Sequence, residues 1–124
     1  MELMTWNDTL AAAAKVWASK CEWNHSFPPL GPQDNTPYGQ NLYSSTNINT
    51  DLVHGVQAWY DEKYGYDYDT LVCSIKPCGH YTQVVWATSR QVGCAYYNCK
   101  GITALSSAYS NSLHLFCNYL HCKN

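Results

Sequence analysis

The chain has 124 residues, a formal net charge of −2 and seven cysteines, with 15% aromatic and only 13% charged residues. This length suits one domain with a real core, and the cysteine content is typical of compact, extracellular chains. The few basic residues are scattered, which excludes a stripe for nucleic acid, and no apolar run approaches the roughly 18 residues of a membrane span.

The first predicted element is a helix over residues 7–20. Alanines fill this stretch, and larger apolar residues recur at steps of four, three and four, which predicts one buried helix face. The residues on this face are Leu10, Ala14, Trp17 and Cys21.

Two Asn-x-Ser/Thr tripeptides begin at Asn7 and Asn24. Both are candidate glycosylation sites of a secreted chain. For Asn7 the alternative is a helix cap, because asparagine is favoured at that position.

The middle of the chain combines an irregular loop with a second helix. Residues 26–38 carry four of the five prolines, which predicts an irregular loop. Residues 39–43 are expected to form a short turn or strand. Thr50-Asp51 can cap a second helix, in which one stripe is expected to hold Leu52, Val56, Trp59 and Lys63.

The second half of the chain is predicted to be rich in strands, at residues 81–86, 93–97 and 113–119. The first is β-branched and aromatic with one polar interruption, which predicts a largely buried strand. The third alternates apolar and polar residues over much of its length. Helices first and strands later are typical of an α+β fold.

The cysteines favour disulfides over a zinc site. The close spacings are five residues each and none is a paired CxxC knuckle. Spacing alone leaves the connectivity open.

Residues 78–99, CGHYTQVVWATSRQVGCAYYNC, resemble the signature of the CAP superfamily of cysteine-rich secretory proteins, antigen 5 and plant pathogenesis-related protein 1. Residues 39–43 and 115–119 resemble two further family motifs. Residues 59–62 together with 66–68 resemble the animal glioma-pathogenesis-related branch. The resemblance implies a single CAP/SCP domain over residues 1–124, N-terminally truncated. Its expected fold is a disulfide-stapled, three-layer α-β-α sandwich with a central antiparallel sheet, lacking the family's first helix.

The resemblance also implies three disulfides. The pairs are Cys21 with Cys99, Cys73 with Cys78, and Cys94 with Cys117. Cys122 is left over, either as a free thiol or as a disulfide link to a second chain.

A polar cavity is implied around His80, Glu62 and Gln40, where Gln40 stands at a position that is most often glutamate in the family. In the full architecture two histidines and two acidic residues can hold zinc. Here one histidine is missing and one carboxylate is neutral, so we expect no required cofactor and at most weak zinc binding. The alternative is that His80 and Glu62 hydrogen-bond each other and join the sheet to the helix.

Family members are associated with sterol and lipid binding. The leading hypothesis is therefore a secreted, non-catalytic module that recognises a lipid, a sterol or an extracellular protein surface. An enzyme is less favoured, because the serines lie in no nucleophile-elbow motif. The alternatives are a metal-dependent hydrolase with an incomplete site and a stapled fragment without a ligand. The expected ligand groove borders residues 43–50 and the tyrosines Tyr43, Tyr64, Tyr66 and Tyr68.

Overall fold

A computed structural model describes residues 1–47, 49–100 and 111–121. Its main sheet has the strand order β1 (Thr5–Trp6), β5 (Ser89–Lys100), β6 (Asn111–His121) and β2 (Gly39–Ser45). β5, β6 and β2 are antiparallel, whereas the two-residue β1 runs parallel to β5. The expected central antiparallel sheet is confirmed, with this parallel edge added.

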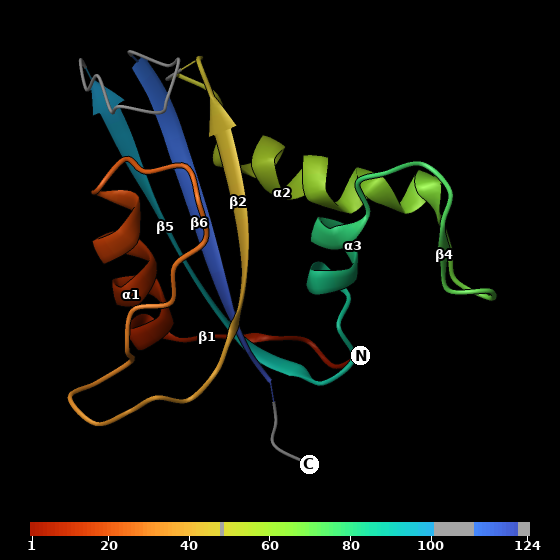
Figure 1. The fold of residues 1–124 in the computed structure, drawn as a ribbon, viewed down its shortest axis with the longest axis horizontal. Helices are drawn as coiled ribbons and strands as arrows, with labels where there is room; N and C mark the ends of the chain where they lie inside the picture. The colour runs from red at the N-terminus through yellow and green to blue at the C-terminus, as the bar shows by residue number, and fades with distance from the viewer. Residues whose placement is uncertain (48, 101–110, 122–124) are drawn as a thin grey trace.

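Helices cover both faces of the sheet (Figure 1). α1 (Asp8–Ala18) packs on β5 and β6, and the opposite face carries α2 (Leu52–Asp61) and α3 (Gly79–Val84). A short 3₁₀ helix, η1 (Glu62–Gly65), follows α2 and leads into a hairpin of β3 (Tyr66–Asp67) and β4 (Val72–Cys73). The three-layer α+β architecture is therefore confirmed.

α1 forms where it was predicted and is capped by Asn7. The Asn7 Oδ1 accepts hydrogen bonds from the backbone N–H groups of Thr9 and Leu10. Its Nδ2 donates to Gln91 at 2.9 Å. The helix lies so close to β5 that a Cβ on Gly93 would come within 2.3 Å of the backbone nitrogen of Ala11. Glycine is required at this crossing because no larger residue fits.

The core has one apolar cluster on each side of the sheet. On the α1 side, Phe116 and Leu42 pack against Ala14 and Ala18. On the α2 side, Trp59 packs against a row of residues on β6: Leu115, Cys117 and Tyr119. Alternate residues of β2 and β6 thus enter opposite layers, as the period of two in a strand requires.

The apolar stripe predicted for α2 is partly wrong. Trp59 is buried and Leu52 is half-buried, but Val56 is 43% exposed and the other buried residue is Gly55. A Cβ on Gly55 would lie 2.9 Å from side-chain atoms of Leu115 and Tyr43. The helix therefore approaches the sheet through glycine, which turns Val56 outward.

The strand predicted over residues 81–86 is also wrong, because Gly79–Val84 is the helix α3. Its first backbone N–H groups need partners outside the helix. Glu62 supplies them, accepting from the N–H of His80 at 3.0 Å and of Tyr81 at 3.1 Å. This tertiary contact overrides the local β propensity. The strands predicted over 93–97 and 113–119 are confirmed within β5 and β6.

Candidate functional site

The Glu62–His80 pair lies where η1 meets α3. Glu62 Oε1 is 2.6 Å from His80 Nδ1, while Oε2 accepts the two backbone N–H groups that begin α3. The Glu62 side chain is 13% exposed and that of His80 is 33% exposed. A carboxylate only accepts, so His80 Nδ1 carries a proton and Nε2 faces away from the pair. The hydrogen bond expected between these residues is therefore present, and it joins η1 to α3.

Two further contacts orient His80. The Trp59 ring stacks on the imidazole with centroids 6.1 Å apart and planes inclined by 22°. The Asn41 side chain on β2 donates to the His80 carbonyl at 3.1 Å. His80 is thus held by Trp59 of the helix layer and by Asn41 of the sheet. The Glu62–His80 pair therefore has a structural role at the contact between the two layers.

Gln40 does not join this pair. Asn41 points toward α3, so its neighbour Gln40 points toward the α1 side. There the Gln40 amide donates to Ser26 O and to Asn118 Oδ1, both at 2.9 Å, and its oxygen lies 3.1 Å from His25 Nδ1. The structure does not bring Gln40 into one cavity with His80 and Glu62, as was expected. The reason is that Gln40 and Asn41 are successive residues of a strand and therefore face opposite layers. The histidine that Gln40 does meet is His25.

These side chains do not fit a zinc centre with three protein ligands. Both oxygens of Glu62 already accept N–H groups. In the part of the chain that the structure describes, no group of three or more His, Cys, Asp or Glu side chains could hold a metal ion. Weak zinc binding through His80 stays a prediction, which calorimetry can test.

The structure separates the four tyrosines of the expected ligand groove. Tyr43 is half-buried on β2, in the cluster around Trp59. Tyr66 lies against the ring of Tyr81, with centroids 5.6 Å apart. Tyr64 and Tyr68 are exposed. Whether any of them binds a ligand stays a prediction, but one groove lined by all four is not what the structure shows.

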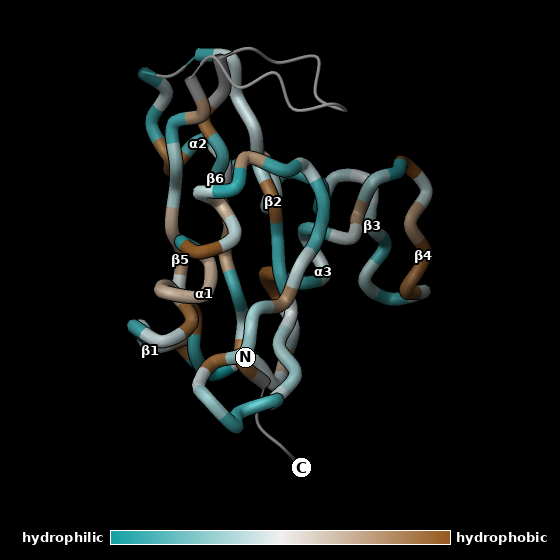
Figure 2. Tube along the Cα trace, turned by 60° about the vertical axis from the view of Figure 1, so that its left-hand side comes forward, coloured by the Kyte–Doolittle hydropathy of each residue, from teal (hydrophilic) through white to brown (hydrophobic). Residues whose placement is uncertain are grey.

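Residues 64–75, called the projecting hairpin below, extend away from the sheet (Figure 1). Figure 2 shows apolar residues along its β4 arm. Four of its apolar side chains are at least two-thirds exposed: Tyr64 at 78%, Tyr68 at 73%, Leu71 at 70% and Ile75 at 67%. Sequence reasoning found the tyrosines but missed Leu71 and Ile75. The signal for them was three aliphatic residues within five positions, Leu71, Val72 and Ile75, next to the tyrosine-rich segment of residues 64–68.

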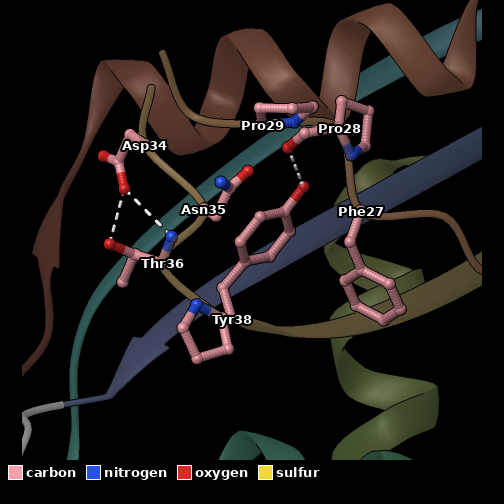
Figure 3. Close-up of a pocket in the computed structure, with 8 residues that line it drawn as sticks. Phe27, Pro28, Pro29, Asp34, Asn35, Thr36 and Tyr38 are labelled. Atoms are coloured by element: carbon pink, nitrogen blue, oxygen red, sulfur yellow. Dashed lines mark hydrogen bonds between the residues drawn. The ribbon is translucent and has the colours of Figure 1, made fainter. Parts of the chain in front are cut away.

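A separate concave site, called the loop pocket below, is formed by residues 27–38 (Figure 3). It has a volume of about 410 Å³ and is lined by three prolines, Phe27, Tyr38 and the polar residues Asp34, Asn35 and Thr36. The Tyr38 hydroxyl donates to the Pro28 carbonyl at 2.6 Å, and burial raises the pKa of Tyr38 to about 12. The sequence predicted only an irregular loop here.

The three expected disulfides are all present: Cys21–Cys99, Cys73–Cys78 and Cys94–Cys117. Cys122 lies outside the described residues. Of the two glycosylation candidates, Asn7 uses its side chain as the α1 cap, whereas Asn24 is exposed. Among the described residues, no helix is long and apolar enough to cross a bilayer.

Comparison with known proteins agrees with this geometry. The model of the cysteine-rich secretory protein family, CAP, matches residues 1–119. Peptidase inhibitor 15-A of Danio rerio is 38% identical over 129 residues, which cover 96% of this chain and 48% of that protein. Human cysteine-rich secretory protein LCCL domain-containing 2 is 38% identical over 128 residues, covering 96% of this chain and 25% of that protein. The chain thus spans about half or less of the length of these relatives.

Solved structures show the same fold. Venom allergen-like protein 4 of Schistosoma mansoni superposes with a TM-score of 0.70 at 25% identity, over 97% of this chain and 69% of that one. NaASP2, solved with Zn²⁺, gives 0.65 at 24% identity, over 96% and 60%. The latter likeness concerns the fold alone and carries no metal site across. Together with the match over residues 1–119, these findings show that the chain belongs to the cysteine-rich secretory protein (CAP) family.

Proposed function

We propose that this chain is an extracellular, non-catalytic binding module whose projecting hairpin docks into an apolar recess of a protein partner. The observation that carries the proposal is Leu71. It is 70% exposed and adopts a left-handed backbone with φ of 58°. A bulky side chain is disfavoured there, whereas asparagine or glycine is tolerated. An exposed leucine kept in a strained position is better explained by an external contact than by folding.

The hairpin is convex and apolar, with acidic residues beside the tip. Asp67 Oδ1 accepts the backbone N–H groups of Thr70 and Asp69. These hydrogen bonds, those from Thr70 first, hold the pKa of Asp67 below its ordinary value, so it stays ionised under extracellular conditions. The complementary partner surface is an apolar recess with a basic rim.

The base of the hairpin is anchored. The backbone N–H groups of Ser74 and Ile75 both donate to the Gly65 carbonyl, at 2.8 and 3.3 Å. The Cys73–Cys78 disulfide ties the same base to the start of α3. An anchored hairpin loses less conformational entropy on binding than a loose loop, which favours affinity.

Three observations support an extracellular, non-catalytic role. Three disulfides persist in oxidising compartments. Within the described ranges, the one hydrogen-bond partner of the His80 ring is Glu62 rather than a serine or threonine hydroxyl. All six described cysteines are in disulfides, so none of them is a thiolate nucleophile.

The relatives suggest the class of partner. Several are named peptidase inhibitors, and they match 96% of this chain. A peptidase cleft is a recess, and a convex hairpin is the shape that fills one. We therefore place extracellular peptidases first among the partners to test.

The test is an inhibition titration of purified serine, cysteine and metallopeptidases with the wild-type chain, Leu71→Asn and Val53→Asn. Val53 is the matched control, because it is 65% exposed on α2, away from the hairpin. We expect inhibition of at least one peptidase, weakened tenfold or more by Leu71→Asn and less than twofold by Val53→Asn. Equal loss in both variants, or inhibition untouched by Leu71→Asn, contradicts the role of the hairpin.

A second candidate function is binding to lipid. The hairpin exposes the aromatic side chains of Tyr64 and Tyr68 together with the aliphatic side chains of Leu71 and Ile75. This combination of exposed residues is typical of membrane-interface segments. The two aspartates of the hairpin disfavour anionic lipid, so binding should be to neutral or sterol-containing vesicles. Vesicle co-sedimentation that Leu71→Asn abolishes, in the absence of any peptidase inhibition, would favour this function over the first.

A further inference from the structure

The Cys73–Cys78 disulfide is accessible from outside the fold. It joins β4 to the residue before α3, where the chain returns from the projecting hairpin to the helix layer (Figure 1). Cys73 is half-buried, whereas Cys78 is 6% exposed. Both residues line a recess of about 420 Å³, a volume within the usual range for small-molecule sites. A small molecule can therefore approach the bridge from the side of Cys73.

The other two bridges are protected by the core. Cys21 and Cys99 are 2% and 3% exposed. Cys117 is 2% exposed, and its partner Cys94 is half-buried but packs in the apolar cluster around Trp59. An external reagent reaches such sulfurs only when the surrounding structure opens. The three bridges should therefore differ in how fast a thiol reduces them.

Loop length indicates that the chain stays folded when Cys73–Cys78 alone is reduced. This bridge spans five residues, whereas the other two span 23 and 78. In the loop-entropy account the shortest loop contributes least to stability. After its reduction the base of the hairpin is held by the hydrogen bonds from Ser74 and Ile75 to the Gly65 carbonyl, which open without breaking a covalent bond.

We propose that Cys73–Cys78 is a thiol–disulfide exchange site for a small extracellular thiol, and that its reduction releases the hairpin from α3. The attacking thiolate forms a mixed disulfide with Cys73 Sγ, the original S–S bond breaks, and Cys78 leaves as a thiolate that takes a proton from water. A second thiolate attacks the small-thiol sulfur of the mixed disulfide. Cys73 then leaves as a thiolate, and the two small thiols end as their own disulfide.

The first test measures the selectivity of reduction. The chain, with Cys122→Ser to remove the seventh cysteine, is incubated in reduced glutathione under native conditions, alkylated at intervals and mapped by mass spectrometry. We expect Cys73 and Cys78 to become alkylated at least about tenfold faster than the cysteines of the other two bridges, because those need the fold to open. Equal rates for the three bridges, or earlier opening of either buried bridge, overturn the proposal.

The second test identifies the sulfur that is attacked. Cys78→Ser leaves a thiol at Cys73, and Cys73→Ser leaves a thiol at Cys78. N-ethylmaleimide should modify Cys73 at least about fivefold faster than Cys78, because Cys73 is the more exposed of the two. Faster modification of Cys78 contradicts the assignment of Cys73 as the site of attack.

The third test measures release of the hairpin. Reduction of this bridge should speed hydrogen–deuterium exchange in residues 66–73 by at least about threefold, while α1 exchanges as before. The double variant Cys73→Ser with Cys78→Ser should exchange like the reduced chain, and glutathione should change it no further. Equal exchange in the bridged and the reduced chain overturns the release. These measurements need no peptidase, so their outcome is independent of the proposed peptidase contact.

Discussion

Glu62 should contribute about 2–3 kcal/mol to the free energy of unfolding, although its side chain contacts only the first residues of the six-residue helix α3. Its carboxylate accepts the backbone N–H groups of His80 and Tyr81 and the ring N–H of His80, at 2.6 to 3.1 Å. Glu62→Ala leaves all three donors without their partner. The His80 ring is one-third exposed and can bond to water, so we count only the two backbone groups. At 1–1.5 kcal/mol each, the expected loss is about 2–3 kcal/mol.

For a domain of this size, that loss corresponds to a fall in Tm of about 8–12 °C. Thermal unfolding followed by near-UV circular dichroism, with urea unfolding as a second measure, should detect it. Glu62→Gln should lose roughly half as much, since the amide keeps an acceptor. Glu22→Ala is the control, because Glu22 is exposed and should change stability by less than about 0.5 kcal/mol. A Glu62→Ala Tm within 2 °C of the wild type would refute the joint between η1 and α3.

Three further perturbations test other parts of the structure. Gln40→Glu should destabilise the fold by about 2–4 kcal/mol in urea unfolding, because a carboxylate cannot donate to Ser26 and Asn118. A gain in stability would mean that the Gln40 side chain faces the other layer. Removal of the Cys21–Cys99 bridge, which closes a loop of 78 residues, should lower the free energy of unfolding by about 4 kcal/mol. Removal of Cys73–Cys78, which closes a loop of five, should lower it by about 2 kcal/mol, and equal losses would argue against the loop-entropy account. Burial lowers the pKa of His114 below its ordinary value of 6.5, so the unfolded chain takes up this proton first and stability should fall as the pH drops below about 6.5. His114→Phe should flatten that pH dependence between pH 7 and 5, and an unchanged slope would assign it to other groups.

The disulfide framework could be predicted from the family resemblance, and the two long strands from local sequence patterns. β5 and β6 combine strand-forming residues with cysteines at positions that pair across the sheet, Cys94 opposite Cys117. α1 could be predicted for a similar reason, because its alanine-rich face and Asn7 cap lie within one continuous segment.

The helix α3 could not be predicted from its own residues. Its segment has strand-like composition, and the group that satisfies its first N–H donors, Glu62, comes 18 residues earlier in the chain. Local propensity contains no information about such a partner.

The placement of Gln40 depends on the sheet rather than on residue type. Resemblance put Gln40 beside His80, but the pairing of Gln40 with Asn118 in β6 assigns both side chains to the α1 layer. A shift of one residue in this register would exchange Gln40 for Asn41. The loop pocket was missed for a related reason: proline content predicts an irregular loop but not how Phe27 and Tyr38 pack within it.

The central claim is that the projecting hairpin is the surface that meets a protein partner. Hydrogen–deuterium exchange of the chain, alone and saturated with an inhibited peptidase, tests it most directly. We predict that protection on binding concentrates in residues 66–75, including the N–H groups of Leu71 and Val72, while α1 and residues 27–38 exchange as before. Protection confined to any other segment, with residues 66–75 unchanged, would contradict the claim.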